Sequence, residues 1–173
     1  MQAEDAGSLA TKVSILVFCS QILDMSTLKE GDKAPKFKGI IETGEQVSLA
    51  DYKGEKLVLY FYPKDMTPGC TNQACNLRDE YGELKKAGFE ILGVSPDPAE
   101  RHQRFIDKYS LPFHLVADTE KEIAKAYGVW GLKKFMGREY MGIMRTTFVI
   151  ENGIITKIIS KVKTKAHADQ LLE

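Results

Sequence analysis

The chain has 173 residues, of which 43% are hydrophobic and 28% are charged; these proportions are typical of one globular domain and exclude wholesale disorder. Its 24 basic residues balance its 24 acidic residues, so no general positive field exists to hold nucleic acid or an anionic membrane. Three cysteines are too few, and odd in number, for the disulfide framework of a small secreted protein. Thiol chemistry, metal binding and plain packing all remain open for them.

Residues 1–25 are expected to form an N-terminal extension outside the folded core. Their apolar run, residues 13–19, is far shorter than the roughly 18 residues that a membrane-spanning helix needs. Acidic residues precede that run and no small-residue cleavage site follows it, which disfavours a secretory signal, although a targeting role stays the alternative. We therefore expect a single domain over residues 26–173, a cytoplasmic location and an incidental role for Cys19.

The first half of the domain predicts strands alternating with helices. Residues 40–49 are typical of a short hairpin around a glycine-containing loop. Residues 57–62 are apolar throughout, as in a strand that is buried on both faces, and residues 89–94 predict a second such strand. Between these two strands, residues 68–87 predict one continuous helix.

The second half predicts a helix, a strand, a helix, an antiparallel hairpin and a final helix. The hairpin follows from Asn152-Gly153, a pair that favours the mirror-image turns between two strands. The predicted ranges are, in chain order, 98–109, 114–118, 120–127, 146–150 with 154–161, and about 165 to the end. Residues 128–144 are predicted to be a loop, long enough to suggest a function.

This order of elements predicts the fold class. Alternating strands and helices indicate an α/β protein with a parallel core, and the closing antiparallel hairpin makes the sheet mixed. A β-β-α unit that follows a β-α-β unit is the order of a thioredoxin-like domain. We therefore predict a thioredoxin-like fold with a mixed central sheet flanked by helices.

Cys70 is the first candidate for chemistry, because it falls in the first turn of the predicted helix. Thr67 suits the N-cap and Pro68 the first helical position. Free backbone N–H groups and the positive end of the helix favour a thiolate there, and the thiolate is the reactive form of cysteine. The alternative is that Cys70 is a small apolar residue of the core.

Cys75 follows five residues later and lies off the apolar stripe of the helix, which comprises positions 70, 74, 77, 81 and 84. In an intact helix the two cysteine α-carbons are roughly 8.6 Å apart, beyond the limit of about 7 Å for a disulfide. A bond between them therefore needs the helix to unwind. The spacing fits neither a C-x-x-C disulfide exchanger nor a zinc site. An incidental, half-exposed thiol is the alternative for Cys75.

The pattern Pro63-x-x-x-Thr67-x-x-Cys70 resembles the active-site motif of peroxiredoxins, and the additional Cys75 is similar to the bacterioferritin comigratory protein or peroxiredoxin Q subfamily. Residues 61–65, 127–131 and 145–148 resemble the same subfamily. The resemblance implies a thiol peroxidase that acts on hydrogen peroxide and organic hydroperoxides, with thioredoxin or a similar dithiol as reductant. It implies no cofactor and no metal.

The resemblance also implies a role for each residue of the motif. Cys70 would attack the peroxide and become a sulfenic acid, and Cys75 would resolve that acid as an intramolecular disulfide. Thr67 would hydrogen-bond the thiolate and the peroxide, and Pro63 would shield the thiolate. Arg145 would stabilise the thiolate and the departing oxygen; without the resemblance, nothing distinguishes it from the other arginines.

Two other functions remain open for this sequence. One is a redox-regulated interaction or sensor protein, in which a disulfide between the two cysteines switches a partner surface. The other is a noncatalytic thioredoxin-like module with packed cysteines. The peroxidase interpretation predicts a hydroperoxide and a dithiol as partners, no nucleic acid or membrane, and a monomer or at most a weak dimer.

Overall fold

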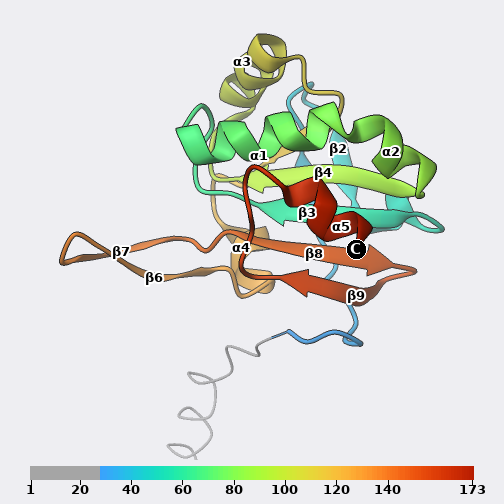
Figure 1. Ribbon diagram of the computed structural model, residues 1–173. Helices are drawn as coiled ribbons and strands as arrows, with labels where there is room; N and C mark the ends of the chain where they lie inside the picture. The colour runs from blue at the N-terminus through green and yellow to red at the C-terminus, as the bar shows by residue number, and fades with distance from the viewer. Residues whose placement is uncertain (1–27) are drawn as a thin grey trace, which may run out of the picture.

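The computed structural model describes residues 28–173, and a five-stranded mixed sheet forms its centre (Figure 1). The strands lie in the order β5-β4-β3-β8-β9, of which β3, β4 and β5 are parallel and β8 and β9 are antiparallel to their neighbours. Their bounds are β3 Lys56–Phe61, β4 Phe89–Ser95, β5 His114–Ala117, β8 Thr146–Glu151 and β9 Ile154–Ile159. The predicted mixed α/β sheet is confirmed. The predicted extension and Cys19 lie outside the described residues.

Helices cover both faces of the sheet (Figure 1). One face packs against α1, α2, α3 and α5. The other packs against α4, the two-stranded antiparallel sheet of β1 and β2, and the 3-10 helix η1 that follows β2. The bounds are α1 Pro68–Asp79, α2 Tyr81–Lys86, α3 Ala99–Tyr109, α4 Glu122–Ala126, α5 His167–Leu172, β1 Lys38–Ile40, β2 Gln46–Ser48 and η1 Leu49–Tyr52. Among residues 28–173, no helix has both the length and the apolar composition to cross a membrane.

Strand β3 is buried on both faces, as its apolar run predicts. Leu57 and Leu59 contribute to the core on the α4 side, and Val58 and Tyr60 to the core beneath α1 and α2. Because β3 is central and parallel to β4, its carboxyl end lies at the edge where α/β sheets place their sites. The loop that leaves this end leads directly into α1.

The predicted helix over residues 68–87 is divided in two, which corrects the expectation of one continuous helix. Glu80, with φ −97° and ψ 9°, departs from helical geometry between α1 and α2. Leu77 before the break and Leu84 after it are both fully buried. The break thus lets two helical segments keep their apolar faces on the twisted sheet, whereas Tyr81, beside the break, is only half-buried.

Residues 128–144 are not a loop, which is a second correction. They contain the hairpin of β6 Trp130–Phe135 and β7 Arg138–Ile143, which extends away from the main sheet (Figure 1). Met136 and Gly137 form its turn with φ of 49° and 78°. Most of its side chains are exposed, so the sequence lacks the apolar alternation that reveals a half-buried strand. The predicted Asn152-Gly153 turn is confirmed, with φ of 51° and 78°.

Candidate active site

Cys70 lies in the first turn of α1, directly beyond the carboxyl end of β3. The chain enters the helix through Thr67 and Pro68, and the Thr71 amide donates to the Thr67 carbonyl at 2.9 Å. The Cys70 side chain is 1% exposed, so the sulfur is shielded from bulk water at the positive end of a helix. The predicted first-turn position of this cysteine is confirmed.

The loop before Cys70 is held by a cluster of fully buried polar side chains. Asp65 accepts hydrogen bonds from the Tyr62 hydroxyl at 2.5 Å and lies 2.7 Å from His102 Nδ1. His102 also contacts the Val116 carbonyl through Nε2 at 3.1 Å. These contacts tie the loop to α3 and β5, and Met66 adopts a positive φ of 62° within it. The approach to Cys70 is therefore rigidly shaped by buried groups.

Thr67 and Pro63 lie in the loop between β3 and Cys70, but the Thr67 side chain does not cap the helix. Its hydroxyl donates to the Lys64 carbonyl at 2.9 Å, and it makes no side-chain hydrogen bond to the amides of the first turn. The predicted N-cap position is thus confirmed, but the Thr67 hydroxyl gives its hydrogen to Lys64 and not to the Cys70 sulfur, whose hydrogen-bond partner is Arg145; this corrects the expected bond to the thiolate. Since the hydroxyl hydrogen is already used, the oxygen remains available as an acceptor. Pro63 is half-buried and lies two residues after the end of β3, at the start of the same loop.

Arg145 is the charged partner of Cys70. Its Nη2 lies 3.2 Å from the Cys70 sulfur, although 75 positions separate the two residues. The register explains the approach, because Phe61 at the end of β3 pairs with Thr146, the residue after Arg145. Gly69 makes room for the guanidinium, since a Cβ at that position would lie 3.3 Å from Nη2. A guanidinium in this place stabilises a thiolate by a charge-assisted hydrogen bond.

Gln73 and His167 extend the site behind Arg145. Arg145 Nη1 donates to Gln73 Oε1 at 2.5 Å, and Gln73 Nε2 lies 2.9 Å from His167 Nδ1. Both residues are fully buried. Burial, with a smaller effect of the Arg145 charge, lowers the pKa of His167 from 6.5 to about 4, so the imidazole is neutral near pH 7.

Cys75 lies in the same unbroken helix as Cys70, and both thiols are free. Cys70 is buried, whereas Cys75 is half-buried, which agrees with its predicted place off the apolar stripe. The regular helix keeps the α-carbons roughly 8.6 Å apart, too far for a disulfide. The structure therefore represents the reduced arrangement, and a bond between the two sulfurs needs a change of backbone.

Sequence reasoning missed Gly69, Gln73 and His167. Gln73 carries a weak signal, because it follows Cys70 by three positions and so lies on the same side of the helix. Gln73 thus lies beside the apolar stripe, where a buried polar side chain needs a hydrogen-bond partner. His167 has no such signal, since only the docking of α5 onto α1 brings it to Gln73.

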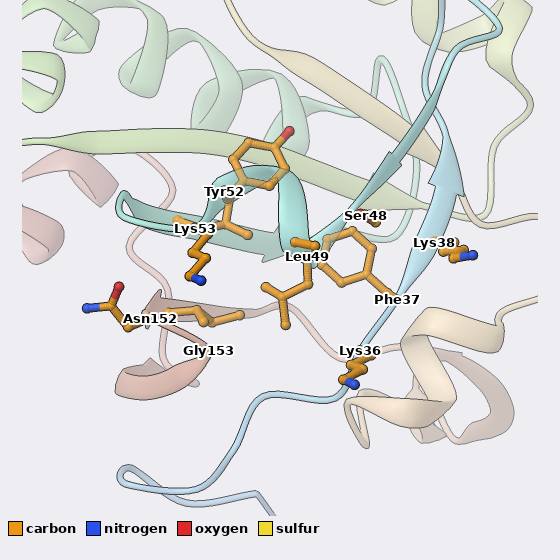
Figure 2. Close-up of a pocket in the computed structure, with 12 residues that line it drawn as sticks. Lys36, Phe37, Lys38, Ser48, Leu49, Tyr52, Lys53, Asn152 and Gly153 are labelled. Atoms are coloured by element: carbon orange, nitrogen blue, oxygen red, sulfur yellow. The ribbon is translucent and has the colours of Figure 1, made fainter.

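A cavity of about 580 Å³ lies elsewhere in the molecule and is not part of this site. Figure 2 shows it between the β1 segment, η1 and the turn after β8, with Phe37, Leu49 and Tyr52 among its walls. It borders Leu57, near the amino end of β3, whereas Cys70 follows the carboxyl end. Neither described cysteine lines it. Among residues 28–173, no three His, Cys, Asp or Glu side chains gather as metal ligands do.

Comparisons with known proteins show what this arrangement resembles. Residues 30–158 match the AhpC/TSA family. Peroxiredoxin Bcp of Escherichia coli strain K12 is 48% identical over 149 residues, which are 86% of this chain and 96% of that protein. Peroxiredoxin Bcp of Bacillus subtilis strain 168 is 49% identical over 148 residues, with coverage of 85% and 94%.

Solved structures of peroxiredoxins also resemble this chain. Peroxiredoxin Q of Xanthomonas campestris matches with a TM-score of 0.74 and 37% identity, over 79% of this chain and 87% of that one. A mutant of PrxQ from Xylella fastidiosa matches with a TM-score of 0.79 and 30% identity, over 85% and 94%. A further Xanthomonas campestris structure, of bacterioferritin comigratory protein, is described in terms of alkyl peroxide reduction and matches at 36% identity and a TM-score of 0.74, over 79% and 87%.

Proposed function

The chain belongs to the AhpC/TSA family of peroxiredoxins, and from this membership and the site geometry we propose that Cys70 is its peroxide-attacking residue and Cys75 its resolving residue. As a peroxiredoxin it is a thiol peroxidase that reduces hydroperoxides with electrons from a thiol reductant. The observation that carries the assignment to Cys70 is the 3.2 Å contact between its sulfur and Arg145, at the buried start of α1.

The first step is attack of the Cys70 thiolate on the terminal oxygen of the hydroperoxide. The new S–O bond forms as the O–O bond breaks, and Cys70 becomes a sulfenic acid. The alkoxide or hydroxide that departs takes a proton and leaves as alcohol or water. Arg145 stabilises the negative charge on sulfur and then on the departing oxygen. Thr67 Oγ1 accepts a hydrogen bond from the hydroxyl of the bound hydroperoxide, because its own hydrogen is donated to the Lys64 carbonyl.

The second step joins the two cysteines of α1. The Cys75 thiolate attacks the Cys70 sulfur, the S–S bond forms as the S–O bond breaks, and the hydroxyl leaves as water after taking a proton. A dithiol then reduces this disulfide by exchange. In the first step, Pro63 shields the Cys70 thiolate, and because proline has no backbone N–H it adds no hydrogen-bond donor beside Arg145. This sequence consumes one hydroperoxide and one reduced dithiol per turnover.

We propose thioredoxin as that dithiol, and hydrogen peroxide and organic hydroperoxides as the substrates. The alkyl peroxide reduction described for the Xanthomonas campestris relative supports the organic class. The small, odd number of cysteines does not suit a secreted disulfide framework, so we assign the protein to the cytoplasm, as a monomer or weak dimer with its peroxidase domain over residues 26–173. Turnover with thioredoxin, measured with a panel of hydroperoxides, tests both choices.

Replacing Cys75 by serine is expected to stop the reaction after its first step. The Cys75→Ser protein should consume one equivalent of hydroperoxide and retain a sulfenic acid on Cys70, because the proposed resolving thiol is gone. Trapping with dimedone and mapping of the labelled peptide measures this. Continued turnover with thioredoxin at the wild-type rate, or label on another residue, would contradict the roles assigned to the two cysteines.

Oxidation is expected to unwind the start of α1. The cysteine α-carbons must close from roughly 8.6 Å to below about 7 Å, which an intact helix does not allow. Hydrogen exchange should therefore quicken over residues 68–78 in the disulfide form, while the region of Leu84, which is fully buried, stays protected. Equal protection of residues 68–78 in both forms, with the disulfide confirmed by mass, would show that the helix does not unwind.

A further inference from the structure

The inner part of the Cys70 site is a chain of polar side chains that ends at His167. Arg145 contacts both the Cys70 sulfur and Gln73 Oε1, and the other end of the Gln73 amide lies 2.9 Å from His167 Nδ1. Gln73 and His167 are fully buried, so water does not replace either partner. The hydrogen-bonding state of His167 is therefore linked to the position of the guanidinium.

The Arg145 side chain has only hydrogen-bond donors, and this fixes the orientation of Gln73 and the tautomer of His167. Gln73 must turn its oxygen toward Arg145, so its NH₂ group faces His167. His167 Nδ1 must then accept, which leaves the imidazole neutral with its hydrogen on Nε2. The lowering of the His167 pKa to about 4, by burial first and by the Arg145 charge second, agrees with this state.

The opposite tautomer would break the contact with Arg145. A hydrogen on Nδ1 would require Gln73 to turn its oxygen toward His167 and its NH₂ toward Arg145, where donors would then face donors. In the observed arrangement His167 Nε2 has no hydrogen-bond partner among residues 28–173, although it is buried. That unpartnered group costs free energy, which the charge-assisted bond between Arg145 and Gln73 offsets.

The elements around His167 hold it in this place. The amide of Ala168 donates to Asn76 Oδ1 at 2.8 Å, which docks the start of α5 on α1. The ring of Tyr60 meets the imidazole edge-on, with 6.4 Å between centroids. Burial raises the pKa of Tyr60 well above its usual range, so the phenol stays neutral and Arg145 is the charged group that faces this histidine.

We propose that His167 is a positioning residue of the peroxidase site. By accepting from Gln73 it locks the amide with its oxygen toward Arg145, and the locked amide holds the guanidinium against the Cys70 sulfur. The inference rests on the proposed roles of Cys70 and Arg145, and it adds a residue from the C-terminal helix that touches neither thiol nor peroxide.

A double-mutant cycle on the first chemical step tests the proposal. His167→Leu removes the acceptor and should slow sulfenic acid formation about three- to tenfold, the rate equivalent of one neutral hydrogen bond. His167→Asn places an amide oxygen near the position of Nδ1 and should restore most of the rate. In the Arg145→Ala background, His167→Leu should cause no further slowing, because the group it positions is gone.

Controls separate positioning from general stability. Leu171→Ala, in the same helix and buried outside the polar chain, should lower the melting temperature and leave the first step unchanged. If His167→Leu does not fold, His167→Gln serves, because its amide reaches the Nε2 position rather than Nδ1 and should slow the first step as well.

The outcomes distinguish this inference from the proposed function. An unchanged rate in His167→Leu or His167→Gln, a His167→Asn protein as slow as His167→Leu, or the same slowing by His167→Leu with and without Arg145, would overturn the positioning role alone. An unchanged rate in Arg145→Ala itself would instead overturn the role proposed for Arg145 in catalysis.

Discussion

Replacing Cys70 by serine is expected to reduce peroxide turnover to the uncatalysed background. A serine hydroxyl is not ionised near neutral pH, so neither Arg145 nor the positive end of α1 has an anion to stabilise. Serine is nearly the same size, and the buried start of α1 should therefore keep its structure. Consumption of hydroperoxide with thioredoxin and its reductase measures the loss, and circular dichroism checks the fold.

Cys19 provides the matched control, because the proposed mechanism gives it no role. Cys19→Ser should turn over at the wild-type rate, while Cys70→Ser does not. Wild-type turnover in Cys70→Ser would show that another thiol attacks the peroxide, and loss of turnover in Cys19→Ser would implicate the N-terminal segment in the chemistry.

Replacing Arg145 by alanine is expected to slow the first step roughly 10- to 150-fold. This range corresponds to a charge-assisted hydrogen bond of about 1.5–3 kcal/mol between the guanidinium and the sulfur. The contact is 3.2 Å long, and the second arm of the same guanidinium is held by Gln73. Rapid mixing of reduced Cys75→Ser protein with hydroperoxide isolates the rate of sulfenic acid formation from the resolving step.

Two substitutions sharpen the test of Arg145. Arg145→Lys keeps the charge but loses the two-armed geometry, so its rate should fall between those of the wild type and Arg145→Ala. Arg138→Ala removes an exposed arginine of β7 and should leave the rate unchanged. Equal rates for Arg145→Ala and Arg138→Ala would show that Arg145 is only a surface cation.

Local patterns in the sequence predicted the strands and helices of the central sheet well. Continuous apolar runs identify β3 and β4 because both are buried on two faces, and Asn152-Gly153 identifies the turn between β8 and β9. The β6–β7 hairpin was missed because most of its side chains are exposed, so its strands show no apolar alternation. The break at Glu80 was missed because it follows from fitting α1 and α2 to a twisted sheet, which no local pattern encodes.

Local sequence patterns likewise predicted only the part of the candidate site that depends on residues close together in the sequence. Cys70 and its place at the start of a helix follow from neighbours in the sequence, and Arg145 followed only from resemblance to a family. The contact of Arg145 with Cys70 depends on the pairing of β3 with β8, and the contact of His167 with Gln73 depends on the docking of α5. Such partners are selected by tertiary structure, so a single sequence does not reveal them.

Mass spectrometry after one turnover identifies the partner of Cys70 in the oxidised protein, and with it the resolving cysteine. Reduced protein is mixed with one equivalent of hydroperoxide, quenched with acid and an alkylating reagent, and digested without reductant. We expect the loss of two hydrogen atoms per chain and a peptide in which Cys70 is linked to Cys75 within one chain. A persistent sulfenic acid on Cys70, a disulfide between two chains, or a bond to Cys19 would contradict this pairing.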